Sequence, residues 1–210
     1  MRKITVTEGL NELKLYDVKI NKGISVAQFC GAAKKSSDKV GVVQKEDFIK
    51  RATASFQSVE DMISNRNKLK SAIVKSNAET IINVNGKEMT RAEGIERKNS
   101  IEYEESLLME MKKQYVSASA TVEKENKKVD AKIDDLISTL VGRDSSKKID
   151  KEEQEAVEKP YREKNEFMLV DPIGIFDKML ELEAEIEGFK SNIDSALVLS
   201  NATSFIEVDF

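Results

Sequence analysis

The stretch from Thr90 to about residue 140 most constrains the fold, because no proline interrupts it. It opens with TRAE, a capping box in which Thr90 and Glu93 satisfy each other's free backbone N–H groups at a helix start. A helix of about 50 residues would span about 75 Å. Apolar residues seven positions apart form one column along it: Ile101, Leu108, Tyr115, Val122, Val129 and Leu136. The column predicts a coiled-coil-like seam within an antiparallel helical hairpin or a multi-subunit bundle.

Three other segments also space their apolar residues at helical intervals. Residues 7–21 predict an N-terminal helix capped by Thr7. Longer helices are predicted at about 46–75 and 172–199, and Asp171 is the expected N-cap of the last one. The helix 172–199 has the clearest amphipathic pattern, with apolar residues at intervals of three and four.

Two predicted helix ends have nearly the same sequence, SNAETIINV at 76–84 and SNATSFIEV at 200–208. We expect each helix to end at the asparagine, which tolerates the left-handed conformation, and to continue into a strand. Asn85-Gly86 predicts a hairpin turn after the first exit. Four short strands are expected to form one small sheet at one end of the helices: 80–84, 87–89, 167–170 and 204–208.

The predicted fold is therefore mainly α, a long antiparallel helical hairpin or bundle with a coiled-coil-like seam. A small β-sheet, made of a hairpin and the C-terminal strand, lies at one end. Charged residues make up 34% of the chain, with two prolines and nine glycines, which favours long, solvent-exposed helices. We expect a single helical domain, 1–210. Its segment 1–45 holds the N-terminal helix and an irregular extension, and 142–165 is a charged connector.

Composition excludes several classes of function. The chain has no histidine, which removes histidine-based nucleophilic catalysis and histidine-liganded zinc. Cys30 is the one cysteine, and its apolar neighbours favour a buried small residue over a reactive thiol. The net charge of -4 is spread over interspersed acids and bases, which argues against duplex nucleic acid as a partner. No apolar run reaches the length of a membrane span, so a cytoplasmic protein is expected.

The run RNKLKSAIVKSNAETIINVNGKEMTRAEGIERK resembles the centre of the septicolysin-like family of small helical proteins. The residues that carry the resemblance are Asn77, Thr80, Gly86-Lys87, Thr90, Ala92 and Arg97-Lys98. The C-terminal helix and strand, including Asn201 and Thr203, are also similar to that family. The resemblance covers residues 60–110 and 173–208, and it implies a helical homo-oligomer in the form of a ring. The style of the sequence also resembles proteins encoded by bacteriophages of Gram-positive hosts.

The best candidate for a binding site is a group of basic and hydroxyl residues at the start of the long helix. A helix N-terminus favours an anion through its free N–H groups and its dipole. An arginine in the first turn opposes that dipole, so it needs an anion or a partner carboxylate. The alternative is that these residues serve as caps and as salt bridges within or between subunits. The ligand-binding candidates are Lys87, Thr90, Arg91, Arg97 and Lys98.

No pattern of residues predicts an enzyme, a cofactor or a metal site. Gly86-Lys87 lacks the preceding glycine of a P-loop, since Ile81 stands at that position. The leading hypothesis is a non-catalytic, homo-oligomeric protein of phage type, with a ring-like hexamer as one candidate form. It would sequester an anionic, nucleotide-derived small molecule in the host cytoplasm. The alternative is a virion structural or assembly protein, or an intracellular scaffold, built by helical self-association.

Overall fold

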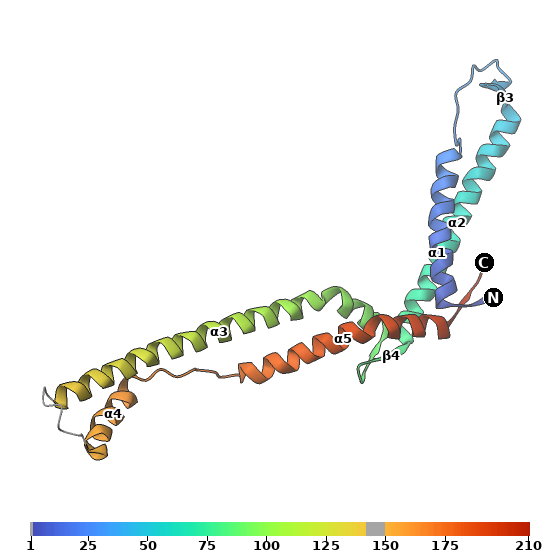
Figure 1. Cartoon of the computed structure of the whole chain (residues 1–210). Helices are drawn as coiled ribbons and strands as arrows, with labels where there is room; N and C mark the ends of the chain where they lie inside the picture. The colour runs from blue at the N-terminus through green and yellow to red at the C-terminus, as the bar shows by residue number, and fades with distance from the viewer. Residues whose placement is uncertain (1, 142–149) are drawn as a thin grey trace. The chain divides into compact units, whose positions relative to one another are not determined.

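The computed structural model describes residues 2–141 and 150–210, and they are mainly helical, as predicted (Figure 1). The helices are α1 Val6–Val26, α2 Lys45–Glu79, α3 Arg91–Val141, α4 Lys151–Asn165 and α5 Ile175–Thr203. The strands are β1 Arg2–Thr5, β2 Lys39–Val40, β3 Val43–Gln44, β4 Ile81–Val84, β5 Lys87–Thr90 and β6 Phe205–Val208. The chain divides into two compact units, Met1–Ser100 with Gly188–Phe210, and Ile101–Glu187. Since α3 and α5 each contribute to both units, this division does not decide whether the chain is one domain.

The predicted apolar columns are the covered faces of the long helices. Every member of the seven-residue column of α3 is half-buried or buried, and Val129 is the most buried of them. In α5 the stripe is buried at Met179, Ile186, Phe189 and Ile193. The periodicity therefore identified both the helices and the sides on which they pack.

Two helix starts differ from the predictions. The N-cap of α1 is Thr5 rather than Thr7, and α1 runs on to Val26. α5 begins at Ile175, three residues after the predicted start, because Gly174 adopts a positive φ of 66°. The Asp171 carboxylate still caps this end, since it accepts from the backbone N–H of Ile175 at 2.8 Å.

The sequence prediction of one small sheet is wrong. β4 and β5 form the predicted hairpin by themselves, and the Asn85-Gly86 turn has the positive φ angles of 53° and 80° that its residues favour. β6 pairs instead with β1, an antiparallel strand that the sequence patterns did not predict. Residues 167–170 form no strand. The third pair, β2 with β3, lies in the segment expected to be irregular.

The first unit has its apolar core where α1 and α2 lie side by side over the β1–β6 pair (Figure 1). Its buried members come from both helices and both strands: Ile4, Val6, Leu13, Leu69, Ile73, Ile206 and Val208. Strand pairing thus ties the two ends of the chain to the helical pair. Burying a side chain of this kind contributes about 1.5–3 kcal/mol.

The second unit consists of antiparallel parts of α3 and α5, together with α4. The Tyr115 and Phe176 rings lie 5.7 Å apart, and Lys112 pairs with Glu183. The predicted connector 142–165 contains helix α4, and its residues 142–149 lie outside the described part of the chain. Arg162 of α4 pairs with Asp130 of α3 at 2.8 Å, so α4 is held against α3.

The repeated Ser-Asn-Ala sequence corresponds to a structural repeat in the first unit. α2 with β4 and α5 with β6 are both helix-to-strand exits, and both strands alternate exposed and buried residues. In each exit the first residue after the helix donates its backbone N–H to the serine carbonyl four residues earlier. These bonds join Thr80 to Ser76 at 2.9 Å and Ser204 to Ser200 at 3.0 Å. The helices include the asparagines, so the predicted left-handed asparagine caps are wrong.

The strand-to-helix entries repeat as well. β1 leads into α1 through TVTEG, and β5 leads into α3 through TRAEG. Val6 and Arg91, which follow the two threonines, donate backbone N–H groups to Ser204 and Thr80, the first residues after the two exits. The glycine of each entry lies under one isoleucine of the paired strand. A Cβ on Gly9 would come within 3.0 Å of Ile206 Cδ1, and a Cβ on Gly94 within 2.9 Å of Ile82 Cδ1.

Candidate functional site

Thr90 caps α3 as the sequence predicted. Its hydroxyl accepts from the Glu93 backbone N–H at 3.1 Å, and Glu93 Oε2 accepts from the Thr90 backbone N–H at 2.6 Å. The hydrogen bonds from the backbone and hydroxyl of Thr90 hold the pKa of Glu93 below its ordinary value. The carboxylate of Glu93 therefore already places a negative charge at this helix start.

Arg91 is fully buried, with 0% of its surface exposed. Its Nη1 donates to Asn77 Oδ1 at 3.1 Å and to Ser76 Oγ at 3.5 Å. Its Nη2 donates to Ser200 Oγ at 2.8 Å, to the Ser200 carbonyl at 3.3 Å and to Ser204 Oγ. The Arg91 guanidinium therefore joins both Ser-Asn-Ala exits through neutral oxygen atoms, and we call this group the Arg91 junction.

No carboxylate of the described residues bonds to Arg91, so its charge needs another source of stabilisation. Ser76 with Asn77, and Ser200, belong to the last turns of α2 and α5. A helix C-terminus carries about half a negative charge, so two such ends favour a guanidinium between them. Desolvation by burial lowers the pKa of Arg91, but an arginine side chain in a protein still keeps its proton. The first-turn arginine is thus explained by helix ends rather than by an anion.

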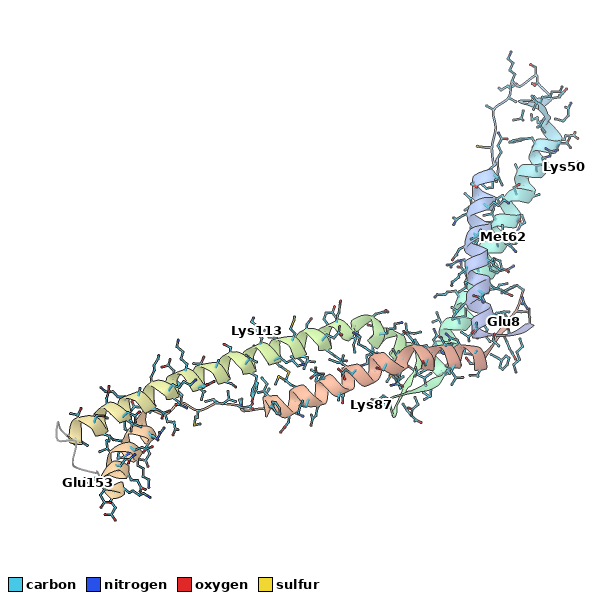
Figure 2. All side chains as sticks on the ribbon, in the orientation of Figure 1. Glu8, Lys50, Met62, Lys87, Lys113 and Glu153 are labelled. Atoms are coloured by element: carbon cyan, nitrogen blue, oxygen red, sulfur yellow. The ribbon has the colours of Figure 1, made fainter. Side chains whose placement is uncertain are left out.

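The other basic candidates lie apart from the junction. Lys98 forms an ion pair with Asp194 of α5, and both side chains are exposed. The Arg97 guanidinium lies over the Phe189 ring, 4.6 Å from its centre. Lys87 is exposed on β5 (Figure 2). Thr90 and Arg91, which are neighbours in the sequence, have separate tasks. None of the pockets described for this part of the chain is lined by any of the five residues.

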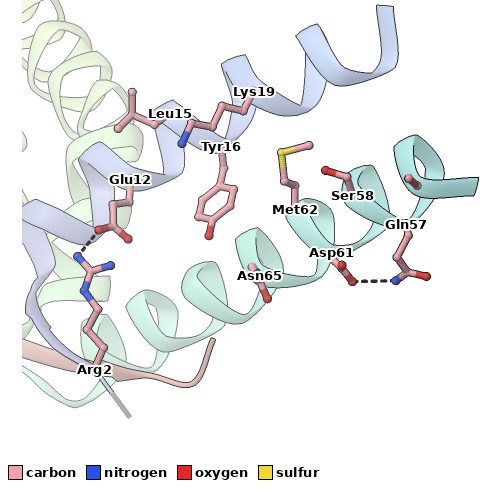
Figure 3. Close-up of a pocket in the computed structure, with 11 residues that line it drawn as sticks. Arg2, Glu12, Leu15, Tyr16, Lys19, Gln57, Ser58, Asp61, Met62 and Asn65 are labelled. Atoms are coloured by element: carbon pink, nitrogen blue, oxygen red, sulfur yellow. Dashed lines mark hydrogen bonds and ion pairs between the residues drawn. The ribbon is translucent and has the colours of Figure 1, made fainter. Parts of the chain in front are cut away.

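A pocket with a volume of about 750 Å³ lies between α1 and α2. In Figure 3 the Tyr16 ring points from α1 into the space between the two helices, toward the side of Asn65 and Met62. Arg2 pairs with Glu12 at one end, and Gln57 donates to Asp61 at 2.9 Å at the other. Because these two pairs bind four of the polar side chains in the pocket to one another, its chemistry suits the packing of helices better than the binding of an ion.

In the described part of the chain, no three acidic or cysteine side chains come together as a metal site. None of the described helices has the length and apolar content needed to cross a bilayer. Cys30 is exposed, in contrast to the expected burial.

Comparison with protein-family models, with curated proteins and with solved structures finds no match. The resemblance to the septicolysin-like family therefore stays a prediction.

Sequence reasoning identified Arg91 as unusual but missed its partners. Asn77 was interpreted as a helix cap and the two serines were given no role, whereas the side chains of Ser76, Asn77 and Ser200 all accept from one guanidinium. The capping box at Thr5 was missed too, although TVTEG repeats the TRAEG pattern that marked Thr90. Taken together, the Ser-Asn-Ala repeat and the TVTEG–TRAEG repeat would have predicted the paired exits and entries.

Proposed function

We propose that this chain is a non-catalytic structural or scaffold protein whose working form is a homo-oligomer built by helix packing. The observation that carries the proposal is that more large hydrophobic side chains are exposed than are buried among the described residues. Exposed apolar side chains that lie together are typical of protein–protein contact sites, and the exposed Phe29 and Phe56 rings lie against each other in the first unit. A bacteriophage virion or assembly role remains part of the proposal as one setting for such a scaffold.

Light scattering after size exclusion, over a hundredfold range of protein concentration, tests self-association. The expected mass is a multiple of 23.6 kDa that holds or falls smoothly on dilution. A mass of 23.6 kDa at every concentration would refute the proposal.

The hypothesis of a protein that sequesters a nucleotide-derived anion stays a prediction. The geometry supports this hypothesis less than it supports self-association, because Arg91 is buried and Glu93 already supplies a negative charge at the start of α3. The self-associating scaffold is therefore the function that the geometry supports best.

A further inference from the structure

One row of exposed apolar residues runs along α2 on a line separate from its contact with α1. Ile49, Phe56 and Ile63 are seven residues apart and are 53%, 52% and 39% exposed. Val59 and Leu69, in contrast, are buried on the side that packs against α1. A seven-residue repeat keeps side chains in one line along a helix, so this row is suited to a second helix.

An aromatic pair lies at the centre of the row. Phe29, which follows α1, meets Phe56 edge to face with ring centres 6.1 Å apart, and Phe29 is itself 43% exposed. Aromatic side chains at the middle of an apolar patch are the usual anchors of protein interfaces. We call Phe29, Ile49, Phe56 and Ile63 together the α2 stripe.

We infer that the α2 stripe is the contact between two copies of this chain, with α2 packed antiparallel on the partner's α2 about a two-fold axis at Phe56. The inference rests on the proposed self-association and names its interface. In this register Phe56 meets its own copy, and Ile49 lies opposite Ile63 of the second copy. An isologous contact of this kind closes on itself and needs one patch only.

The area of the stripe is sufficient for such a contact. Half-exposed side chains of this size leave about 100 Å² each in water, so two copies would bury about 800 Å² of apolar side chain. Because interfaces are slightly more than half apolar, the whole contact would be about 1,400 Å². That value lies within the range of about 1,200–2,000 Å² for specific interfaces.

Charge favours the antiparallel direction. The first turn of α2 contains Glu46 and Asp47. The basic residues Arg66, Lys68 and Lys70 follow two thirds of the way along the helix, and Arg66 among them already pairs with Asp17 of α1. An antiparallel pair places the acidic turn opposite that basic stretch. A parallel pair in register would set each charge beside its own copy, which is unfavourable.

Cysteine cross-linking tests the register, in a Cys30→Ser background because Cys30 is exposed. Phe56→Cys should form a disulfide-linked dimer on mild oxidation. Ile49→Cys and Ile63→Cys should cross-link when mixed and far less when each is oxidised alone. Cross-linking of Ile49→Cys with itself as efficiently as with Ile63→Cys would overturn the antiparallel register.

Phe56→Glu tests the interface without oxidation. Its half-exposed position should leave the circular dichroism of the folded protein unchanged, while the oligomer mass falls and the melting temperature no longer rises with protein concentration. Val116→Glu is the matched control, because Val116 is an exposed apolar residue of α3 outside the stripe, and this variant should keep the wild-type mass. If Phe56→Glu keeps the wild-type mass, this interface is wrong and self-association stands. If the wild type is itself 23.6 kDa throughout, both proposals fail.

Discussion

Replacing Arg91 by alanine should destabilise the fold more than any substitution of an exposed arginine. The change removes a fully buried guanidinium whose three nitrogens donate to the side chains of Ser76, Asn77, Ser200 and Ser204 and to one carbonyl oxygen. Because these acceptors lie on the last turn of α2, on the last turn of α5 and just beyond it, the loss should loosen both helix ends together.

The size of the loss in stability depends on which hydrogen bonds each acceptor keeps in the absence of Arg91. Ser76 still has the Thr80 hydroxyl within 3.5 Å, and Ser204 still donates to the Ser200 carbonyl. Asn77 and the Ser200 hydroxyl lose the donor that Arg91 supplies. Leaving a buried polar group without its partner costs about 1–3 kcal/mol, and because Asn77 and Ser200 are half-buried, the two together give about 2–4 kcal/mol. This is a large part of the roughly 5–15 kcal/mol by which a protein is stable.

Urea unfolding followed by circular dichroism measures this difference directly. Arg51→Ala, an exposed arginine of α2, is the control and should change the free energy of unfolding by less than about 0.5 kcal/mol. Arg91→Lys should fall between the two, because lysine keeps the charge but lacks the planar fork that reaches both exits. A loss below about 1 kcal/mol in Arg91→Ala would refute the reasoning that the junction joins the two exits.

Three further predictions concern the caps, the turn and ligand binding. The pKa values of Glu8 and Glu93 are lowered from 4.5 in the folded state, so both carboxylates stabilise it above pH 4.5 and lose this effect as the pH falls. The melting temperature of the double variant E8Q/E93Q should therefore lie below wild type at pH 7 and approach it near pH 3. Gly86→Ala should lower the free energy of unfolding by about 1 kcal/mol, because φ is +80° there. A panel of nucleotides should raise the melting temperature if the sequestration hypothesis holds, and no shift across the panel would contradict it.

Periodicity predicted the parts of this fold that depend on single helices. The stripe of α5 and the column of α3 follow from one amphipathic segment each, so neighbouring residues contain the information. The pairing of β1 with β6 joins residues about 200 positions apart, and no local pattern in a four-residue strand specifies its partner. The hairpin of β4 and β5 was predictable because its turn lies between the strands.

The Arg91 junction was only half predictable for a related reason. A first-turn arginine is unfavourable by the helix dipole, which is a local rule, so the sequence identified Arg91 as a residue that needs a partner. Its partners come from helix ends at residues 76–77 and 200, which only the tertiary fold brings together. An anion and two helix ends offer the same negative potential, so sequence alone leaves both explanations open.

The internal repeat leads to a last prediction, about chain connectivity. The β1–β6 pair aligns Arg2 with Val208, just as the hairpin aligns Lys87 with Val84 across its two-residue turn. A permuted chain can join Val208 to Arg2 through Asn-Gly and have its new ends between Asn85 and Gly86. In that chain a turn would connect β6 to β1, and β4 and β5 would no longer be connected by one. The I′ turn suits both strand pairs, so we expect cooperative unfolding within about 2 kcal/mol of wild type.

The permuted chain lacks the contact between the Tyr16 and Phe210 rings, which lie 6.0 Å apart, so a small loss is expected. A control that keeps the new Asn-Gly link but opens the chain beside the buried Leu69 cuts α2 and should fail to fold. If the two permuted chains are equally unstable, the two strand pairs are not equivalent. The repeated Ser-Asn-Ala sequence would then reflect only a similarity between two helix ends. If the two strand pairs are equivalent, a turn must be able to connect the strands of either pair.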